Sequence, residues 1–234
     1  MPPRPVGGES RRDDRTIEPD MTTPRPRLFL VTPRAVALSA FLPKLEAALS
    51  AGDAASLLIT PDMDEDAGFQ KVAEAVAAVA QKNGVAAIVA NDSRVTGRAG
   101  ADGIHIDTGV DDLTDAIERF QPKNFVGAGG LFDRHTAMLA AERGADYVFF
   151  GRIDREEAPG AHPANIALGE WWSSLFEPPC VVMAGADLAT VDAVLDAGAD
   201  FIGMRAAVWS HPGGPAEAVQ FANARIDAFG GDAP

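Results

Sequence analysis

The sequence contains a single cysteine, Cys180, among its 234 residues, so no disulfide can form within the chain. A chain without disulfides is typical of a reducing compartment, and we expect a cytoplasmic location. No apolar run approaches the ~20 residues that a membrane-spanning helix needs, and the N-terminal residues lack the apolar core of a secretory signal. The sequence therefore predicts neither export nor a membrane partner.

Positive charge is also scarce. The chain has 20 Lys and Arg against 34 Asp and Glu, which gives a formal charge of −14. Surfaces that bind nucleic acids are normally basic, so we expect no nucleic-acid partner. An acidic surface also repels anionic ligands, and any phosphate site must therefore rely on backbone amides, a metal ion or a few placed arginines.

Low apolar content marks both ends of the chain. Residues 1–26 are rich in Pro, Arg, Asp and Gly, and we expect a disordered tail there. Residues 230–234, which read GGDAP, are expected to form a second disordered end. The apolar content of 47% is that of a globular protein, and residues 27–229 are predicted to form a single domain.

Eight short apolar runs cross this domain, each of strand length and bounded by Gly, Pro or Asp. They are residues 27–32, 55–60, 86–90, 103–106, 125–129, 147–151, 180–185 and 201–204. Helical patterns separate most of them, and FQKVAEAVAAVAQKNG (69–84) is the clearest. The triplet Gly-Ala-Asp precedes three of the runs, at 100–102, 144–146 and 198–200, where Gly suits the left-handed end of a helix.

Repeated strand and helix units imply a parallel sheet. Eight strands predict an α/β fold of the (β/α)8 TIM barrel type. The alternative is an open, doubly wound sheet with fewer strands. The first strand is not followed by a Gly-rich dinucleotide-binding motif, which favours the barrel.

The active site of a (β/α)8 barrel lies at the C-terminal ends of its strands. Asp92 and Asp107 follow neighbouring strands, and two such carboxylates could hold Mg²⁺. The alternative is that Asp92 or Ser93 caps the next helix. The Asn91 side chain can both donate and accept hydrogen bonds, which suits recognition of a heteroaromatic ring.

Small residues at the other strand ends suggest close approach of a ligand to the backbone. Many barrels bind phosphate after strands seven and eight through amides and a helix N-terminus. The residues with this expected role are Gly127, Gly129, Gly151, Gly185, Ala186, Ala206 and Ala207. The alternative is that the glycines only make tight turns.

Three arginines also lie at strand ends. Arg34, Arg152 and Arg205 could bind a diphosphate by bidentate contacts. The alternative pairs them with acids such as Asp62, Asp107 or Asp154. The loop 154–167 is long for a strand–helix connection, and such loops often close over a ligand. His105, inside the fourth strand, is expected to be a hydrogen-bonded core or mouth residue rather than a base.

Four stretches of the chain resemble the thiamine-phosphate synthase family and its thiazole tautomerase relatives. They are IVANDSRVTGRAGADGIHID (88–107), ERGADYVFFGRI (142–153), PCVVMAGAD (179–187) and LDAGADFIGMRAAVWSHPGGPAEAV (195–219). The resemblance implies a (β/α)8 barrel whose Asn91-Asp92 pair binds a pyrimidine diphosphate and Mg²⁺. It further implies that Ala184-Gly185 and the end of the last strand hold a thiazole phosphate.

The chain departs from the family pattern at several basic positions. The family's second strand ends in Gln-x-Arg-x-Lys, whereas this chain has SLLITPD (56–62). The family's Thr-x-Thr/Ser-Lys loop is replaced by REEAPGAHP (155–163), and the arginine after Asn-Asp is displaced to Arg94. The tautomerases have a histidine after the fifth strand, where this chain has Gly130-Leu131.

These observations leave three functional hypotheses open. The first is an enzyme that joins hydroxymethylpyrimidine diphosphate to thiazole phosphate with Mg²⁺, and Asn91 and Arg152 are then the expected catalytic residues. The second is a divergent barrel that binds or senses a phosphorylated metabolite. The third is a protein that acts through its surface, for example through the helix of Trp171 and Trp172. A homo-oligomer is compatible with each.

Overall fold

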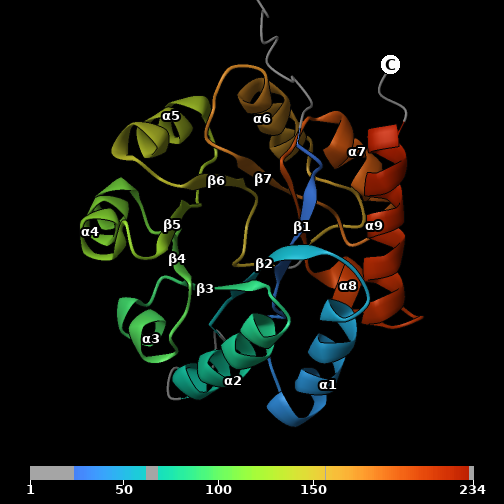
Figure 1. Cartoon of the computed structure of the whole chain (residues 1–234). Helices are drawn as coiled ribbons and strands as arrows, with labels where there is room; N and C mark the ends of the chain where they lie inside the picture. Colours follow the sequence, from blue (N-terminus) through green and yellow to red (C-terminus); the bar gives the residue numbers. More distant parts are fainter. Residues whose placement is uncertain (1–23, 62–67, 156, 232–234) are drawn as a thin grey trace, which may run out of the picture.

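Eight parallel strands form a closed barrel in sequence order, with β1 paired to β8 (Figure 1). The computed structural model describes residues 24–61, 68–155 and 157–231. The strands are β1 (Arg27–Val31), β2 (Ala54–Ile59), β3 (Ala86–Ala90), β4 (Gly103–Ile106), β5 (Phe125–Ala128), β6 (Tyr147–Phe150), β7 (Cys180–Met183) and β8 (Phe201–Met204). Each strand falls within one residue or two of a predicted apolar run, and the predicted (β/α)8 TIM barrel is confirmed.

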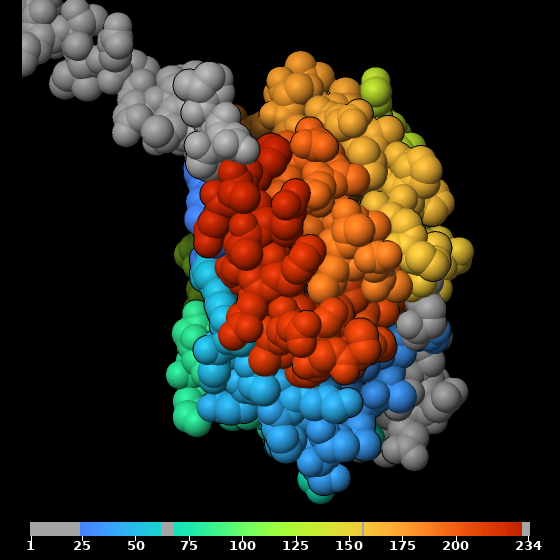
Figure 2. Space-filling model, turned by 90° about the vertical axis from the view of Figure 1, so that its right-hand side faces the viewer, coloured from blue at the N-terminus to red at the C-terminus, as the bar shows by residue number. Residues whose placement is uncertain are grey.

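Helices surround the barrel (Figure 1). They are α1 (Leu38–Leu49), α2 (Phe69–Lys82), α3 (Ser93–Arg98), α4 (Val110–Phe120), α5 (Arg134–Arg143), α6 (Pro163–Ser173), the short 3-10 helix η2 (Leu188–Thr190), α7 (Val191–Asp196), α8 (Ala206–Trp209) and α9 (Pro215–Gly231). The last helix, α9, covers the seam where the chain ends meet, between α1 and α7 (Figure 2). None of the helices in the described ranges is long and apolar enough to cross a membrane.

The predicted disordered ends lie mostly outside the described residues, which exclude 1–23 and 232–234. At the borders the ordered structure extends further than the sequence indicates. Arg25, which we assigned to the tail, hydrogen-bonds to Asp227 and Asn223 of α9. At the other end, α9 continues to Gly231.

Alternating residues of each strand supply two separate apolar layers. Residues that point outward, such as Leu30, Ile104 and Val148, pack under the helices. Residues that point inward form a second cluster along the barrel axis, which includes Phe29 and Phe149. This inner layer fills the barrel below the strand ends, so it forms the floor of any site at the mouth.

The three Gly-Ala-Asp triplets perform the same task at the N-terminal ends of the strands. Each glycine has a positive φ, as predicted for a residue that ends a helix. Each aspartate then accepts the backbone N–H of the preceding strand, at 2.7–2.8 Å. The pairs are Asp102 with Ala87, Asp146 with Val126 and Asp200 with Cys180. The carboxylates therefore tie β3 to β4, β5 to β6 and β7 to β8.

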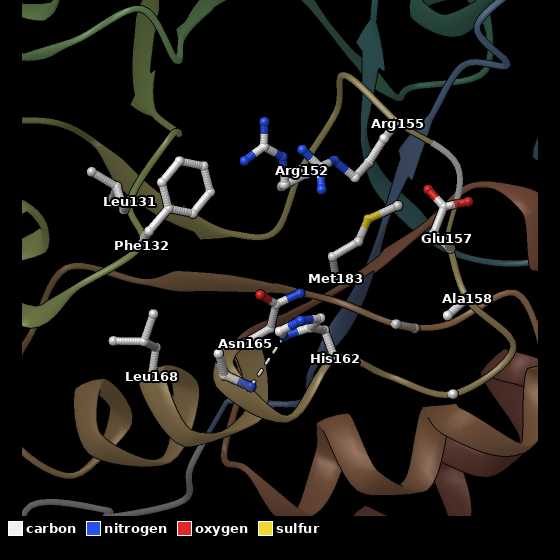
Figure 3. Close-up of a pocket in the computed structure, with 13 residues that line it drawn as sticks. Leu131, Phe132, Arg152, Arg155, Glu157, Ala158, His162, Asn165, Leu168 and Met183 are labelled. Atoms are coloured by element: carbon white, nitrogen blue, oxygen red, sulfur yellow. Dashed lines mark hydrogen bonds between the residues drawn. The ribbon is translucent and has the colours of Figure 1, made fainter.

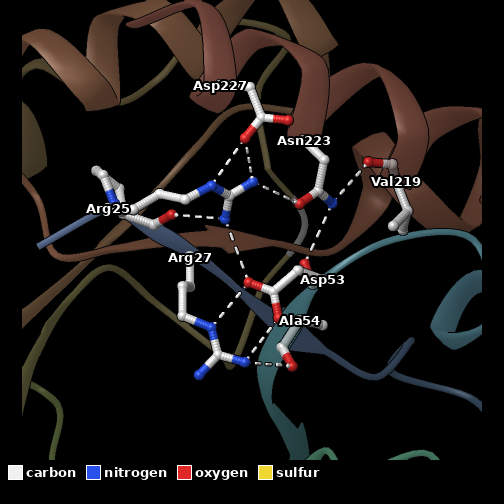
Figure 4. A network of polar contacts seen from close by, with 8 residues as sticks. Arg25, Arg27, Asp53, Ala54, Val219, Asn223 and Asp227 are labelled. Atoms are coloured by element: carbon white, nitrogen blue, oxygen red, sulfur yellow. Dashed lines mark hydrogen bonds and ion pairs between the residues drawn. The ribbon is translucent and has the colours of Figure 1, made fainter. Parts of the chain in front are cut away.

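Asp53 occupies the equivalent place before β2, but it pairs with arginines (Figure 4). Arg27 donates to both of its oxygens, at 2.8 and 2.7 Å, and Arg25 donates at 3.2 Å. The hydrogen bond from Arg27 lowers the pKa of Asp53, and the positive charges of both arginines lower it further. This network joins β1, β2 and α9.

Asp53→Asn should lower the free energy of unfolding by about 1 kcal/mol, because a bidentate charge-assisted pair is lost from a site that is still 40% exposed and screened by water. The folded-state pKa of Asp53 is depressed, so its contribution exists above the unfolded pKa and is lost as the pH falls below about 4. Denaturant unfolding of both proteins at pH 7 and pH 3 measures the difference.

Asp196→Asn is the matched control, because Asp196 is exposed on α7 and makes no hydrogen bond or ion pair with the described residues. If Asp53→Asn lowers the free energy of unfolding by the same amount at pH 7 and at pH 3, this account of the network is contradicted.

Candidate functional site

Asn91 and Asp107 hold each other at the C-terminal ends of β3 and β4. The Asn91 Nδ2 donates to Asp107 Oδ1 at 2.6 Å, and the Asp107 backbone N–H donates to Asn91 Oδ1 at 3.0 Å. Asn91 has a φ of 58°, a left-handed conformation that Asn tolerates better than most residues. The two predicted residues therefore lie together, and one positions the other.

Asp92 caps α3. Its Oδ1 accepts the backbone N–H groups of Arg94 at 2.9 Å and Val95 at 2.8 Å, which is the alternative that the sequence left open. These bonds use one oxygen only. The cap and a metal-binding role are thus compatible, since the second oxygen of the carboxylate makes no hydrogen bond within the described residues.

A metal ion bound at the ends of β3 and β4 would have few protein ligands. Within the described parts of the chain, no group of three or more His, Cys, Asp and Glu side chains is arranged to hold an ion. Mg²⁺ often takes only one or two carboxylates and completes its shell with water and substrate phosphates. The pair Asp92 and Asp107 fits that kind of site and does not fit a metal bound by protein alone.

Arg152, after β6, is paired rather than free. Its Nε and Nη2 donate to the two oxygens of Asp154 at 2.8 and 2.5 Å, and its guanidinium lies 4.8 Å from the centre of the Phe132 ring. The bond to Asp154 raises the pKa of Arg152, and the charges of Asp154 and Asp107 raise it further. Asp154, an acid considered as a partner for these arginines, therefore pairs with Arg152.

Arg205, after β8, is 2% exposed. Its guanidinium donates to the carbonyls of Ile153, at 2.9 Å, and Arg155, and it lies 2.5 Å from a carboxylate oxygen of Glu157. Arg34, after β1, has a buried Nε without a hydrogen-bond partner among the described residues. Asp62, one of the acids considered as a partner for these arginines, lies outside the described residues.

The small residues after β7 and β8 do come together. A hollow of about 420 Å³ is lined by Ala186, Ala206 and Ala207, and also by Pro159 and His211. However, the amides after β7 are in use. Gly185 donates its N–H to the Thr190 hydroxyl at 3.0 Å, and Ala186 donates to the Ala158 carbonyl at 2.8 Å.

Gly127 within β5 and Gly151 after β6 make room for side chains of the barrel interior. A Cβ on Gly127 would lie 1.9 Å from the Tyr147 ring, and one on Gly151 would lie 2.4 Å from the Met183 Cβ. This packing explains both glycines without a ligand. Gly129 lies higher, where a Cβ would meet the His105 Nε2 at 2.3 Å and the Asp107 Cβ at 3.1 Å.

His105 is fully buried beneath the mouth, beside Gly129. Its Nδ1 lies 3.0 Å from the Tyr147 hydroxyl, whereas its Nε2 has no hydrogen-bond partner among the described residues. Burial lowers the pKa of His105 from its ordinary value of 6.5 to about 3. The ring is therefore neutral at physiological pH, and the expectation of a hydrogen-bonded residue holds for one nitrogen only.

A cavity of about 330 Å³ opens between the β5–α5 loop, the β6–α6 loop and α6 (Figure 3). The sequence indicates Arg152, the loop 154–167 and Ala184 among its lining residues. It gives no signal for Leu131, Phe132, Leu168 and Met183. In Figure 3, Arg152 and Arg155 lie on one side of the cavity and Leu168 and Asn165 of α6 on the other. An apolar wall facing two cations suits a ring that carries negative charge.

His105→Gln should flatten the pH dependence of stability. Between pH 6.5 and pH 3 the unfolded chain protonates this histidine and the folded protein does not, so wild-type stability falls as the pH falls, by up to about 1.4 kcal/mol per pH unit. Unfolding at pH 7 and pH 5 tests this, with His135→Gln on the exposed face of α5 as control. Equal pH dependence in both variants would refute it.

The chain matches the family model described as thiamine monophosphate synthase over residues 28–208. It is 38% identical to thiamine-phosphate synthase of Hyphomonas neptunium over 214 residues, which cover 88% of this chain and 96% of the relative. It is 35% identical to thiamine-phosphate synthase of Rhodospirillum centenum over 197 residues, or 82% of this chain and 94% of the relative.

Solved structures show the same fold at lower identity. Thiamine phosphate pyrophosphorylase from Pyrococcus furiosus superimposes with a TM-score of 0.70 at 18% identity, covering 88% of this chain and 97% of its own. A 3-hexulose-6-phosphate synthase superimposes with a TM-score of 0.65 at 20% identity, covering 84% and 98%. The family model and the identity to full-length relatives together show that the chain belongs to the thiamine monophosphate synthase family.

Proposed function

We propose that the protein is a thiamine-phosphate synthase, which joins hydroxymethylpyrimidine diphosphate to thiazole phosphate and releases diphosphate. The observation that carries the proposal is the 38% identity that spans 96% of a relative bearing this name. The mouth geometry supports it, because Asn91 and Asp107 are hydrogen-bonded to each other at the ends of β3 and β4, and Asp92 follows Asn91 directly.

The chemistry suits a mouth without a general base. The bond between the pyrimidine methylene carbon and the diphosphate oxygen breaks, and the bonding electrons leave with diphosphate. The thiazole nitrogen then attacks the resulting cation through its lone pair and forms the new C–N bond. No proton is transferred at the reacting carbon, so a neutral, buried His105 is compatible with the reaction.

Asn91 is proposed to orient the pyrimidine ring, because its amide has one N–H and one lone pair beyond the two bonds to Asp107. Asp92 and Asp107 would hold Mg²⁺, which neutralises charge on a diphosphate when bound. Arg152 would exchange Asp154 for the diphosphate. Each such cation typically contributes several kcal/mol where a leaving group develops charge.

The remaining site residues take roles in binding. Arg34 is proposed to contact the diphosphate, since its Nε is buried without a bond within the described residues. The hollow lined by Ala186, Ala206 and Ala207 is proposed to receive the phosphate of the thiazole. Small phosphorylated substrates are thus the expected partners, and the single cysteine supports a cytoplasmic location.

Incubation of the protein with both substrates and Mg²⁺ should yield thiamine phosphate and diphosphate in equal amounts, and omission of either substrate should abolish both products. Chromatography of the thiamine phosphate and a coupled assay for the diphosphate measure the two. The absence of product under these conditions would rule out the proposal.

A second candidate, a barrel that binds a phosphorylated metabolite without turnover, is favoured by one observation. The family's basic residues of the second strand are absent, and Arg152 and Arg205 are both paired with acids. A rise in Tm on addition of thiazole phosphate, without product, would support it. Of the two residues named for the surface hypothesis, Trp172 is fully buried against Phe150 and Phe176, whereas Trp171 is half-buried.

Asp92→Asn should raise the Mg²⁺ concentration needed for half-maximal activity by roughly tenfold or more, because a charged ligand is lost. The substitution preserves the helix cap, since Asn caps as well as Asp, so a folding defect is not expected. Asp133→Asn is the matched control, because Asp133 caps α5 by the same kind of bond. An unchanged Mg²⁺ dependence would leave Asp92 as a cap alone.

A further inference from the structure

The β6–α6 loop lies on the strand ends where a phosphate is expected. Residues 157–159 of this loop make three polar contacts with the ends of β7 and β8. Glu157 Oε1 lies 2.5 Å from the Arg205 Nη2, the Ala158 carbonyl accepts from the Ala186 amide at 2.8 Å, and the Pro159 carbonyl accepts from the Asp187 amide at 3.1 Å.

The loop approaches this closely because Gly185 has no side chain. A Cβ on Gly185 would lie 2.3 Å from the Pro159 carbonyl oxygen and 2.5 Å from the Gly160 carbonyl carbon. The glycine predicted to let a ligand reach the backbone therefore lets the loop reach it instead. The same space cannot hold the loop and a ligand at once.

The charged pair in this contact is deeply buried, with the Arg205 and Glu157 side chains 2% and 7% exposed. Among the described residues, neither carboxylate oxygen of Glu157 accepts a well-aligned hydrogen bond. The Arg205 Nε also has no hydrogen-bond partner there. A buried carboxylate needs several hydrogen bonds to offset the loss of water. The carboxylate of Glu157 is thus poorly satisfied where it lies, although the Arg205 charge is close.

The Glu157 carboxylate and the carbonyls of residues 158 and 159 supply three acceptor oxygens, as a phosphate group does. The carboxylate carries a negative charge and lies at the Arg205 guanidinium, and the two carbonyls accept from two consecutive amides. A phosphate monoester presents three acceptor oxygens and prefers such donors.

We propose that residues 157–159 are an internal stand-in for a phosphate group, and that Arg205 passes from the Glu157 carboxylate to the phosphate of a substrate when the loop leaves. Arg205 then determines specificity for phosphorylated ligands, and Glu157 competes with them. This inference rests on the proposed function only for the identity of the phosphate ester, because the exchange itself requires no turnover.

The competition predicts opposite effects of two substitutions on phosphate binding. Glu157→Gln weakens the stand-in, so inorganic phosphate and thiazole phosphate should each bind about tenfold more tightly, since less of the protein is held in the occluded form. Arg205→Met removes the shared cation, so both ligands should bind at least about tenfold more weakly. Calorimetric titration without the pyrimidine substrate measures the affinities.

Asp192→Asn is the control, because it breaks an exposed arginine–acid pair, Asp192 with Arg225, away from the mouth. Its phosphate affinity should equal that of the wild type. If Glu157→Gln weakens phosphate binding or leaves it unchanged, the Glu157–Arg205 pair serves only to stabilise the fold and the proposal is wrong.

Amide hydrogen exchange gives a second readout that does not depend on Arg205→Met folding. Exchange at Ala186 and Asp187 should be faster in Glu157→Gln than in the wild type, and added phosphate should slow it again in the variant. Exchange that is unaffected by both changes would overturn the proposal. Because neither readout involves product, failure of the synthase assay would leave this test intact.

Discussion

Carboxylates at the N-terminal ends of the strands hold the barrel in register. Asp102, Asp146 and Asp200 each take an amide from the preceding strand, so three pairs of strands are joined by the same bond. Side chains of neighbouring helices add to it, as where Gln81 donates to Asp102 and to the Gly100 carbonyl. These repeated bonds lie at the end of the barrel away from the mouth, so they do not constrain the loops that follow the strands.

The polar and charged side chains at the mouth of the barrel are already paired with one another. Asn91 holds Asp107, Asp154 holds Arg152, and Glu157 lies on Arg205. An acidic protein can bind a doubly phosphorylated substrate only if positive charge becomes available locally. Under the proposed exchange of partners, Asp154 and Glu157 of the β6–α6 loop would compete with an anion for Arg152 and Arg205.

The sequence predicts the fold well because the fold depends on local patterns. Strand-length apolar runs and the glycines that end helices recur with the barrel unit. Burial at the start of β7 raises the pKa of the Cys180 thiol to about 12. The pairing of Arg205 was beyond prediction, because it depends on where a loop 50 residues away in sequence lies. The cavity in Figure 3 was missed for the same reason, since three separate segments line it. Gly127 shows a packing reason that the sequence does not reveal, because a side chain at this position would meet the Tyr147 ring.

The first strand pair lacks the amide-accepting carboxylate, and its Asp53 instead joins the two ends of the chain. Arg25 reaches Asp227 across 202 residues, and the Trp209 indole donates to the Val31 carbonyl across 178. The seam beside β1 therefore includes hydrogen bonds between residues that lie far apart in the described sequence. The barrel closes only when β8 pairs with β1, so β1 keeps an open sheet edge until residues 201–204 have been synthesised.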